Sequence, residues 1–255
     1  MTTKIQKITN KLPEITLLFW IMKIAATTLG ETAGDLFSMT LNIGYAMSSI
    51  FLFGIFVVAL ITQLRSKKYN PALYWTVILA TSTAGTTMSD FMDRTLGFGY
   101  AMGTSILLSV LLAILGIWYF SEKSLSVTNI KTKKAEVFYW LAILVSNTLG
   151  TALGDFLAHN SGLGFIGGAT LVGSLITLTV VARYFTKISP IILFWVAFIL
   201  TRPFGATIGD LLTKNPSDGG LGFGTIGSSA VLLSILIGFI SFTFNKESRN
   251  TLRLD

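Results

Sequence analysis

One short pattern occurs four times along this chain, each time near the end of an apolar run. It consists of a glycine, three further residues, a glycine or serine, and an aspartate. The four copies end at Asp35, Asp90, Asp155 and Asp210. A carboxylate is costly inside an apolar segment and is normally retained for a function or a specific pairing. The repetition therefore predicts four equivalent structural units whose acidic residues share one role.

Two further features recur with each aspartate and define a repeat. A tryptophan lies 15 residues before every aspartate, and a glycine lies 9 residues after the first three and 14 after the fourth. The fourth copy therefore carries a five-residue insertion around 215–219. Each repeat predicts a helical hairpin, that is, two helices joined by a turn. The eight expected spans are 14–36, 43–64, 71–91, 97–120, 136–157, 163–185, 189–212 and 222–244.

The apolar runs themselves indicate a membrane protein. Of the 255 residues 52% are hydrophobic and 12% are charged, and the mean hydropathy is +0.70. The runs match the roughly 20 residues that a helix needs to cross a bilayer core of roughly 30 Å, and a helix satisfies its own backbone in lipid. We expect an all-α membrane protein with eight transmembrane helices as four parallel-oriented repeats in one domain. The repeats cover about 14–64, 71–120, 136–186 and 189–244, and the halves about 1–125 and 131–255.

The basic residues indicate the orientation. Fifteen of the 19 lie in the two tails and in the connections around 65–68, 123–134 and 183–187, which are every second connection. Because cytoplasmic loops are enriched in lysine and arginine, both termini are expected in the cytoplasm of a multi-pass cell (cytoplasmic or inner) membrane protein. This explains the net charge of +7 without nucleic acid. The lipid bilayer is the expected partner, and a homo-oligomer is compatible with the sequence.

Small residues spaced four apart occur in both helices of every repeat, and in the second helices these pairs begin at 44, 99, 164 and 224. Such pairs allow two helix backbones to approach closely in lipid. We therefore predict a tight bundle in which the first helices of the repeats meet near their aspartate ends. The packing glycines of these first helices are Gly30, Gly34, Gly85, Gly150, Gly154, Gly205 and Gly209.

Closure of the four repeats around an axis would gather their carboxylates into an acidic ring. Glu31 lies one helical turn before Asp35, on the same face. Carboxylate oxygens suit Mg²⁺, Ca²⁺, Mn²⁺ or protons, and acidic rings line cation pores. The candidate cation or metal ligands are Asp35, Asp90, Asp155 and Asp210, with Glu31 beside them. No resident cofactor is expected, and a divalent metal ion would be a substrate. Alternatively, each aspartate bonds only loop amides or a neighbouring base.

A polar residue stands eight positions before each aspartate, namely Thr27, Ser82, Asn147 and Arg202. Eight residues span just over two helical turns, so this residue lies on nearly the same face as its aspartate. The four predict a polar column that leads from the acidic level toward the middle of the membrane. Intramembrane charges usually pair, so we expect Lys23 and Arg202 to neutralise carboxylates when no substrate is bound. A static ion-pair network that fixes repeat packing is the alternative.

The aromatic residues and the only histidine suggest less. The repeat tryptophans and their tyrosine neighbours predict an interfacial belt, formed by Trp20, Tyr74, Trp75, Tyr139, Trp140 and Trp195. His159 lies in an outer connection, where it is expected to be solvated, and a role as a metal ligand or pH sensor is the alternative. The chain contains no cysteine, which excludes disulfides and thiolate metal sites.

The fourfold glycine–aspartate repeat, with its tryptophan and its later Gly-Phe/Tyr element, resembles a family of bacterial polytopic membrane proteins. That family is built from four copies of a short repeat of unknown function, and its members are often described as uncharacterised membrane-anchored proteins. The resemblance covers nearly the whole chain. It implies the fold and a location in the bacterial cytoplasmic membrane, and it implies no activity.

Three functional hypotheses follow. No nucleophile, zinc-protease or phosphate-loop motif is present, so no catalytic residue is predicted. The leading hypothesis is a membrane transporter or channel for a small solute, with a cation expected. One alternative is a structural or assembly membrane protein whose polar residues serve packing only. Another is an intramembrane aspartyl hydrolase, because paired aspartates can share a proton and activate water; the chain lacks the Gly-x-Gly-Asp form of presenilin-like proteases.

Overall fold

The computed structural model describes residues 12–66, 68–128, 130 and 132–252, and that part of the chain is helical and contains no strand. The basic residues at 4–11, 67, 131 and 253, which contributed to the predicted orientation, lie outside the described residues. Two long helices per repeat are confirmed. They are α2 (Leu17–Asp35), α3 (Tyr45–Arg65), α4 (Pro71–Asp90), α5 (Gly99–Glu122), α6 (Lys133–Asp155), α7 (Gly164–Phe185), α8 (Pro190–Thr213) and α9 (Thr225–Leu252).

The first helix of each repeat begins at a local sequence signal. Thr16 caps α2, Asn70 caps α4 and Thr132 caps α6, each by accepting a backbone N–H bond three residues on. Pro71 and Pro190 occupy the first positions of α4 and α8. Proline is tolerated there because its missing N–H would have no partner within the helix.

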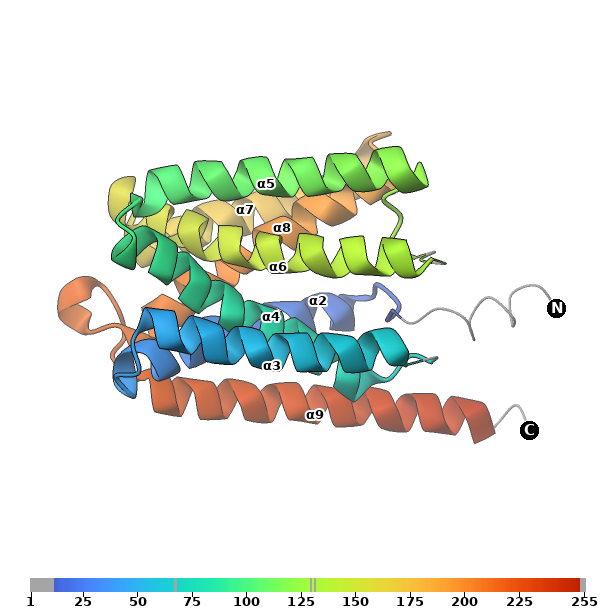
Figure 1. Cartoon of the computed structure of the whole chain (residues 1–255), viewed down its shortest axis with the longest axis horizontal. Helices are drawn as coiled ribbons and strands as arrows, with labels where there is room; N and C mark the ends of the chain where they lie inside the picture. The colour runs from blue at the N-terminus through green and yellow to red at the C-terminus, as the bar shows by residue number, and fades with distance from the viewer. Residues whose placement is uncertain (1–11, 67, 129, 131, 253–255) are drawn as a thin grey trace.

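The first helices of the four repeats form a closed inner bundle. Helix α2 packs against α4 and α8, and α6 packs against the same two helices. The second helices, α3, α5, α7 and α9, lie outside this bundle and run alongside it (Figure 1). The inner helices bury most of their surface, whereas the outer helices expose most of theirs. The polar residues of the chain are therefore concentrated at the centre.

The two helices of a repeat do not pack mainly against each other. Instead, α3 packs on α4, α5 on α6 and α7 on α8, while α9 returns to pack on α2. The two helices of each repeat are thus joined by a turn, as predicted, but their main packing partners belong to neighbouring repeats. The turn after each aspartate carries the chain sideways, so that each outer helix covers the inner helix of the next repeat. This exchange links the fourth repeat to the first and closes the ring.

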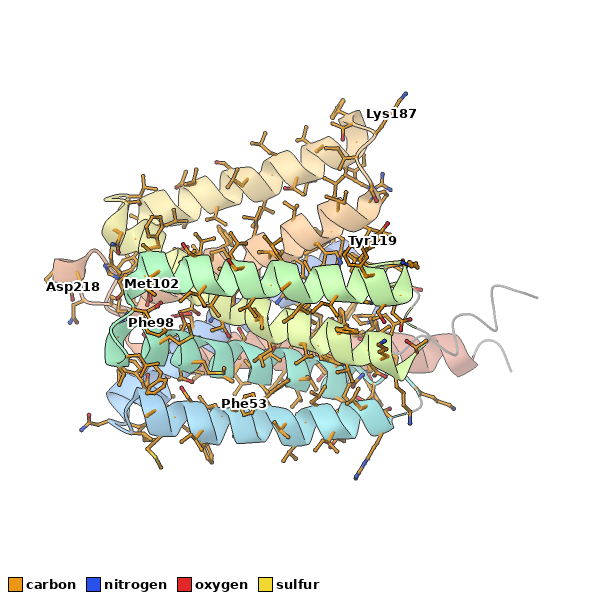
Figure 2. The ribbon with its side chains drawn as sticks, turned by 45° about the horizontal axis from the view of Figure 1, so that its top comes forward. Phe53, Phe98, Met102, Tyr119, Lys187 and Asp218 are labelled. Atoms are coloured by element: carbon orange, nitrogen blue, oxygen red, sulfur yellow. The ribbon has the colours of Figure 1, made fainter. Side chains whose placement is uncertain are left out.

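Six helices are long and apolar enough to cross a membrane, namely α3, α5, α6 with the turn that follows it, α7, α8 and the first part of α9. The predicted spans in α2 and α4 fall short on composition, because these helices hold Lys23, Glu31 and many threonines. Their polar side chains face the bundle interior and are buried. Large apolar side chains cover the outer helices, including Phe53 on α3 (Figure 2). Others are Ile50, Leu112, Leu178, Phe185 and Ile237.

All four inner helices run in the same direction. Figure 2 places Tyr119 and Lys187 at one end of the molecule, and Phe98, Met102 and Asp218 at the other. Helix α2 begins and α9 ends at the Lys187 end (Figure 1). The chain therefore leaves at the end where it entered, as the parallel-oriented repeats predict.

Five of the six residues of the predicted aromatic belt form a buried cluster at the Lys187 end of the bundle, whereas Trp20 is half-buried. Trp75, Trp140 and Trp195 are nearly inaccessible, and the tyrosines beside the first two are buried with them. The hydroxyls of Tyr74 and Tyr139 lie 2.7 Å apart, and the rings of Tyr74 and Trp140 lie 5.6 Å apart. Large rings fill the space between inner helices at this end, while glycines let the helices approach closely at the other. We call these rings the aromatic cluster.

Candidate functional site

The four repeat aspartates lie buried at the end of the bundle opposite the aromatic cluster. Asp35, Asp90 and Asp155 are the last residues of α2, α4 and α6, and each is followed by a wide π-helical turn. Asp210 lies in the last turn of α8. The carboxyl end of a helix carries a partial negative charge. The outer helices begin at the same end, and their amino ends carry the opposite partial charge. The four buried carboxylates themselves therefore create the demand for positive charge.

Lys214 joins the first and fourth repeats. Its ammonium forms an ion pair with Oδ2 of Asp35 and lies 3.2 Å from Oδ1 of Asp210. The lysine side chain is 19% exposed, whereas both carboxylates are almost inaccessible. Burial opposes the charged form of Lys214, but the negative charges of Asp210 and Asp35 outweigh it and raise the pKa of Lys214. The lysine thus lies between the carboxylates and the outside.

Arg94 joins the second and third repeats in the same way. Its Nε lies 2.8 Å from Oδ1 of Asp90, and its Nη2 lies 3.6 Å from Oδ2 of Asp155. The guanidinium also lies over the rings of Tyr45 and Tyr100, 5.8 and 5.7 Å from their centroids. The four aspartates are therefore paired two by two, and each pair shares one basic side chain.

Glu31 and Arg202 form a buried network one turn below the aspartates. Nη1 of Arg202 donates to Oε2 of Glu31 at 2.9 Å. The hydroxyls of Thr86 and Thr151 donate to the same oxygen at 3.3 Å, and Nη2 of Arg202 lies 2.6 and 2.7 Å from these hydroxyls. These residues come from all four inner helices, so the network ties the whole ring together.

One group within this site has the spacing of a metal centre. A carboxylate oxygen from each of Glu31, Asp35 and Asp210 lies within 4.8 Å of the other two, and all three residues are buried. We call these residues the carboxylate triad. The other predicted ligands, Asp90 and Asp155, lie on the far pair with Arg94. All five predicted acids thus lie at one end of the bundle. The aspartates pair with Lys214 and Arg94, and Glu31 pairs with the more deeply buried Arg202.

The polar residues eight positions before the aspartates are all fully buried. Each packs against a glycine of the preceding repeat, and the fourth repeat precedes the first. Ser82 meets Gly30, Asn147 meets Gly85, Arg202 meets Gly150 and Thr27 meets Gly205. Gly34, Gly154 and Gly209 receive Thr86, Ala206 and Glu31 in the same cyclic order. The glycines of the inner helices are thus places where a neighbouring side chain or backbone fits against bare Cα atoms.

The glycines that open the outer helices have a different purpose from the predicted packing. A Cβ atom on Gly44 would meet nothing within 4 Å, and its φ of 81° lies in the left-handed region. Gly99, Gly164 and Gly224 are alike, with φ of 72°, 66° and 72° and open surroundings. Glycine is favoured at such φ values because it has no Cβ. These four residues therefore shape the turn and make no close packing contact. The second members of two predicted pairs do, because a Cβ on Gly103 would clash with Asp93 and one on Gly168 would lie 3.3 Å from Thr207.

The two predicted charge partners behave differently. Arg202 pairs with a carboxylate, that of Glu31. Lys23 is also fully buried, but among the residues that the structure describes it donates to Oδ1 of Asn147 at 3.2 Å and lies 4.1 Å from the centre of the Phe198 ring. It forms no ion pair there. The expectation that Lys23 neutralises a carboxylate is therefore not met in this conformation.

The pairing of Arg94 with Asp90, one helical turn before it, could be expected from the sequence, whereas its contact with Asp155 and the role of Lys214 were not predicted. Both basic residues stand four positions after their repeat aspartate, and the equivalent residues in the other repeats are Met39 and His159. Four residues make one helical turn, so this position faces its aspartate; comparison of the repeats at this position would have revealed the two bases. His159 is exposed and stacks on Tyr100 with 5.6 Å between ring centres.

Fold and site together define a class of protein: an all-helical repeat protein with membrane-compatible helices and a buried polar centre. The chain belongs to the family described as "Repeat of Unknown Function (DUF347)", whose pattern matches residues 18–69, 73–124, 138–189 and 193–247. The four-copy repeat predicted from the sequence is thereby confirmed. No curated protein and no solved structure matches the chain.

Proposed function

We propose that this protein binds a small cation at the aspartate end of the bundle and carries it across the cell membrane. The observation that carries the proposal is the charge balance. Glu31 and the four repeat aspartates are buried, and they have three basic partners, namely the buried Arg202 and the partly exposed Arg94 and Lys214. If all are ionised, two negative charges remain at the site. A cation from solution would balance them.

The chemistry of the ligands narrows the choice of cation. The site offers carboxylate oxygens with threonine hydroxyls nearby, and the chain contains no thiol. Hard oxygen ligands favour Mg²⁺, Ca²⁺, Mn²⁺ or a proton over softer metals. A proton could also be the coupling ion, because clustered carboxylates cannot all stay ionised at low cost.

The arrangement favours a carrier over an open channel. Lys214 and Arg94 are partly exposed at the aspartate end, which offers access from that side. At the opposite end the aromatic cluster fills the bundle with buried rings. A cation that leaves on the Lys187 side therefore requires those rings to separate. Thr27, Ser82 and Asn147 lie between the two ends and are the polar groups that such an opening would uncover.

The two alternatives make different demands on the same residues. A packing role requires only that the ion pairs be satisfied, and it predicts lost stability without a flux defect. An aspartyl hydrolase needs two carboxyls that share a proton, but the ammonium of Lys214 lies between Asp35 and Asp210 and the guanidinium of Arg94 between Asp90 and Asp155. This pairing supports cation binding better than hydrolysis.

Flux in proteoliposomes across a panel of cations tests the proposal. Wild type is compared with Asp35→Asn and Asp155→Asn, one from each aspartate pair, and with Asp218→Asn, an exposed acid at the same end. We expect flux of at least one cation in wild type and Asp218→Asn, and at least a tenfold loss in the other two. No flux for any cation, or wild-type flux in both pair variants, would refute transport. A defect limited to two specific aspartates together with peptide cleavage would favour the hydrolase.

A further inference from the structure

We propose that Lys214 is a tethered cation that occupies a divalent-cation site, and that it must swing out before the free ion can bind. The site is the carboxylate triad of Glu31, Asp35 and Asp210. The inference rests on the proposed function and deepens it, because it names the class of ion and the residue that controls access. It also assigns a role to Lys214, which has no lysine counterpart in the other three repeats.

The geometry of the triad fits one ion. Oxygens on opposite sides of a calcium ion lie roughly 5 Å apart, since each bond is about 2.3–2.6 Å. The three triad oxygens lie within 4.8 Å of one another. The ammonium of Lys214 lies against the carboxylates of two of these residues, Asp35 and Asp210. A basic side chain thus already contacts two of the three carboxylates that a metal ion would bind.

The lysine fills this position incompletely. Oδ1 of Asp210 is buried and lies 3.2 Å from Nζ, yet it receives no hydrogen bond in the described residues. The ammonium instead directs a bond to Asp35 and has the sulfur of Met39 at 3.7 Å. A buried carboxylate oxygen that accepts no hydrogen bond destabilises the folded state. A metal ion has no fixed donor directions and could contact both carboxylates at once.

Formal charge also favours a divalent ion over the lysine. The triad brings three negative charges, and Arg202 compensates one of them. Lys214 compensates a second and leaves one unbalanced. A divalent ion in its place compensates both remaining charges. A monovalent ion would offer no advantage over the lysine, so the charge balance selects the divalent class.

Lys214 is built to move, and Arg94 is not. Lys214 follows the last residue of α8 and directly precedes the inserted segment that only the fourth repeat carries. The side chains of Lys214 and Arg94 are both partly exposed, at 19% and 30%, so the difference lies in their surroundings. Lys214 stands beyond the end of its helix and can reach solvent by rotating its own bonds. Arg94 lies inside the π-helical turn that follows α4, between the rings of Tyr45 and Tyr100. The two basic residues occupy equivalent positions in their repeats, but only the Lys214 side chain is free to rotate away from its carboxylates.

Mn²⁺ binding to the purified full chain in detergent, followed by electron paramagnetic resonance, tests the inference. Lys214→Met removes the tethered cation, and we expect it to lower the Kd for Mn²⁺ at least tenfold. Arg94→Met removes the same charge from the other aspartate pair and should change the Kd less than threefold. Adding Asp35→Asn to Lys214→Met should abolish the gain. Equal affinity in wild type and Lys214→Met, or equal gains in the two methionine variants, would overturn the proposal.

A second measurement on the wild type covers the case in which Lys214→Met fails to fold. Acylation of Lys214 by an amine reagent, followed by mass spectrometry, should accelerate at least fivefold when Mn²⁺ is added, because the ion expels the lysine into solvent. Unchanged or slower acylation would contradict displacement. Flux with unaltered Mn²⁺ affinity in Lys214→Met would sink this inference and leave transport standing. The expected Mn²⁺ binding without any flux would refute transport and leave this inference standing.

Discussion

Arg202 and Glu31 are 171 residues apart in the chain, yet they form a fully buried ion pair with 2.9 Å between Nη1 and Oε2. The pair joins the last inner helix to the first. It also engages threonines of the two helices between them. The Arg202–Glu31 ion pair therefore forms only when all four inner helices have closed into the ring.

Loss of Arg202 should be strongly destabilising. Arg202→Met leaves the carboxylate of Glu31 buried without its partner, and breaking a buried pair costs about 3–5 kcal/mol. The double variant Arg202→Met/Glu31→Gln removes both charges and should regain at least half of the loss. Thermal unfolding in detergent measures both effects. Equal destabilisation in the single and double variants would show that the pair does not act as a unit.

The inner glycines should tolerate no side chain. In Gly150→Ala the added Cβ would overlap the aliphatic part of Arg202 and lie 3.0 Å from Cδ of Pro203. Overpacking of this kind costs about 1–3 kcal/mol. Gly116→Ala in α5 is the matched control, because nothing lies within 4 Å of its added Cβ, and it should be neutral or stabilising. Chemical denaturation compares the two, and similar losses would argue against close inner packing.

Single cysteines should report opposite sides of the membrane. The chain contains no cysteine, so a membrane-impermeant maleimide has no background. Asp218→Cys and Lys187→Cys lie at opposite ends of the molecule (Figure 2). With both termini in the cytoplasm, Asp218→Cys should be labelled in intact cells and Lys187→Cys only after lysis. The reverse pattern would invert the orientation, and labelling of both in intact cells would exclude a spanning arrangement.

Asp93 should make stability depend on pH. Burial raises the pKa of Asp93 to about 6, although the hydrogen bond from Ser89 and the charge of Arg94 act in the opposite direction. In the unfolded chain its pKa is about 3.9. Its favourable contribution is therefore fully present below the unfolded value and is lost as the pH rises through about 6. Wild type should lose more stability than Asp93→Asn between pH 5 and 7.5. Parallel melting profiles would disprove this.

A circular permutant should fold. The α9–α2 interface that closes the ring has the same form as the α3–α4 interface, so no connection between repeats is special. A chain that starts at α4, with the original termini joined by a flexible linker, keeps every helix pair. We expect a monodisperse, helical protein with a melting temperature near that of wild type, as judged by size exclusion and circular dichroism. An aggregated product would indicate that the order of the repeats matters.

The sequence alone determined the repeat, the helix count and the direction of the helices. These features follow from local patterns. Apolar runs predict helices, tryptophan and aspartate recur at a fixed spacing, and two helices per repeat impose one direction on all four repeats. The buried positions of Glu31, the aspartates and the polar residues before them were also predictable, because a helix places residues four and eight apart on nearly the same face.

The tertiary structure decided which helix covers which, and which base neutralises which acid. Exchange of the outer helices depends on the path of the turns after the aspartates, which no periodicity encodes. Trp75, Trp140 and Trp195 are buried between helices while Trp20 is half-buried, a difference that only the placing of neighbouring helices decides, because the same ring is compatible with both settings. Lys214 reaches Asp35 across 179 residues only because the fourth repeat closes on the first. Contacts between distant parts of a chain depend on how whole helices pack against one another, and local sequence patterns do not specify that packing.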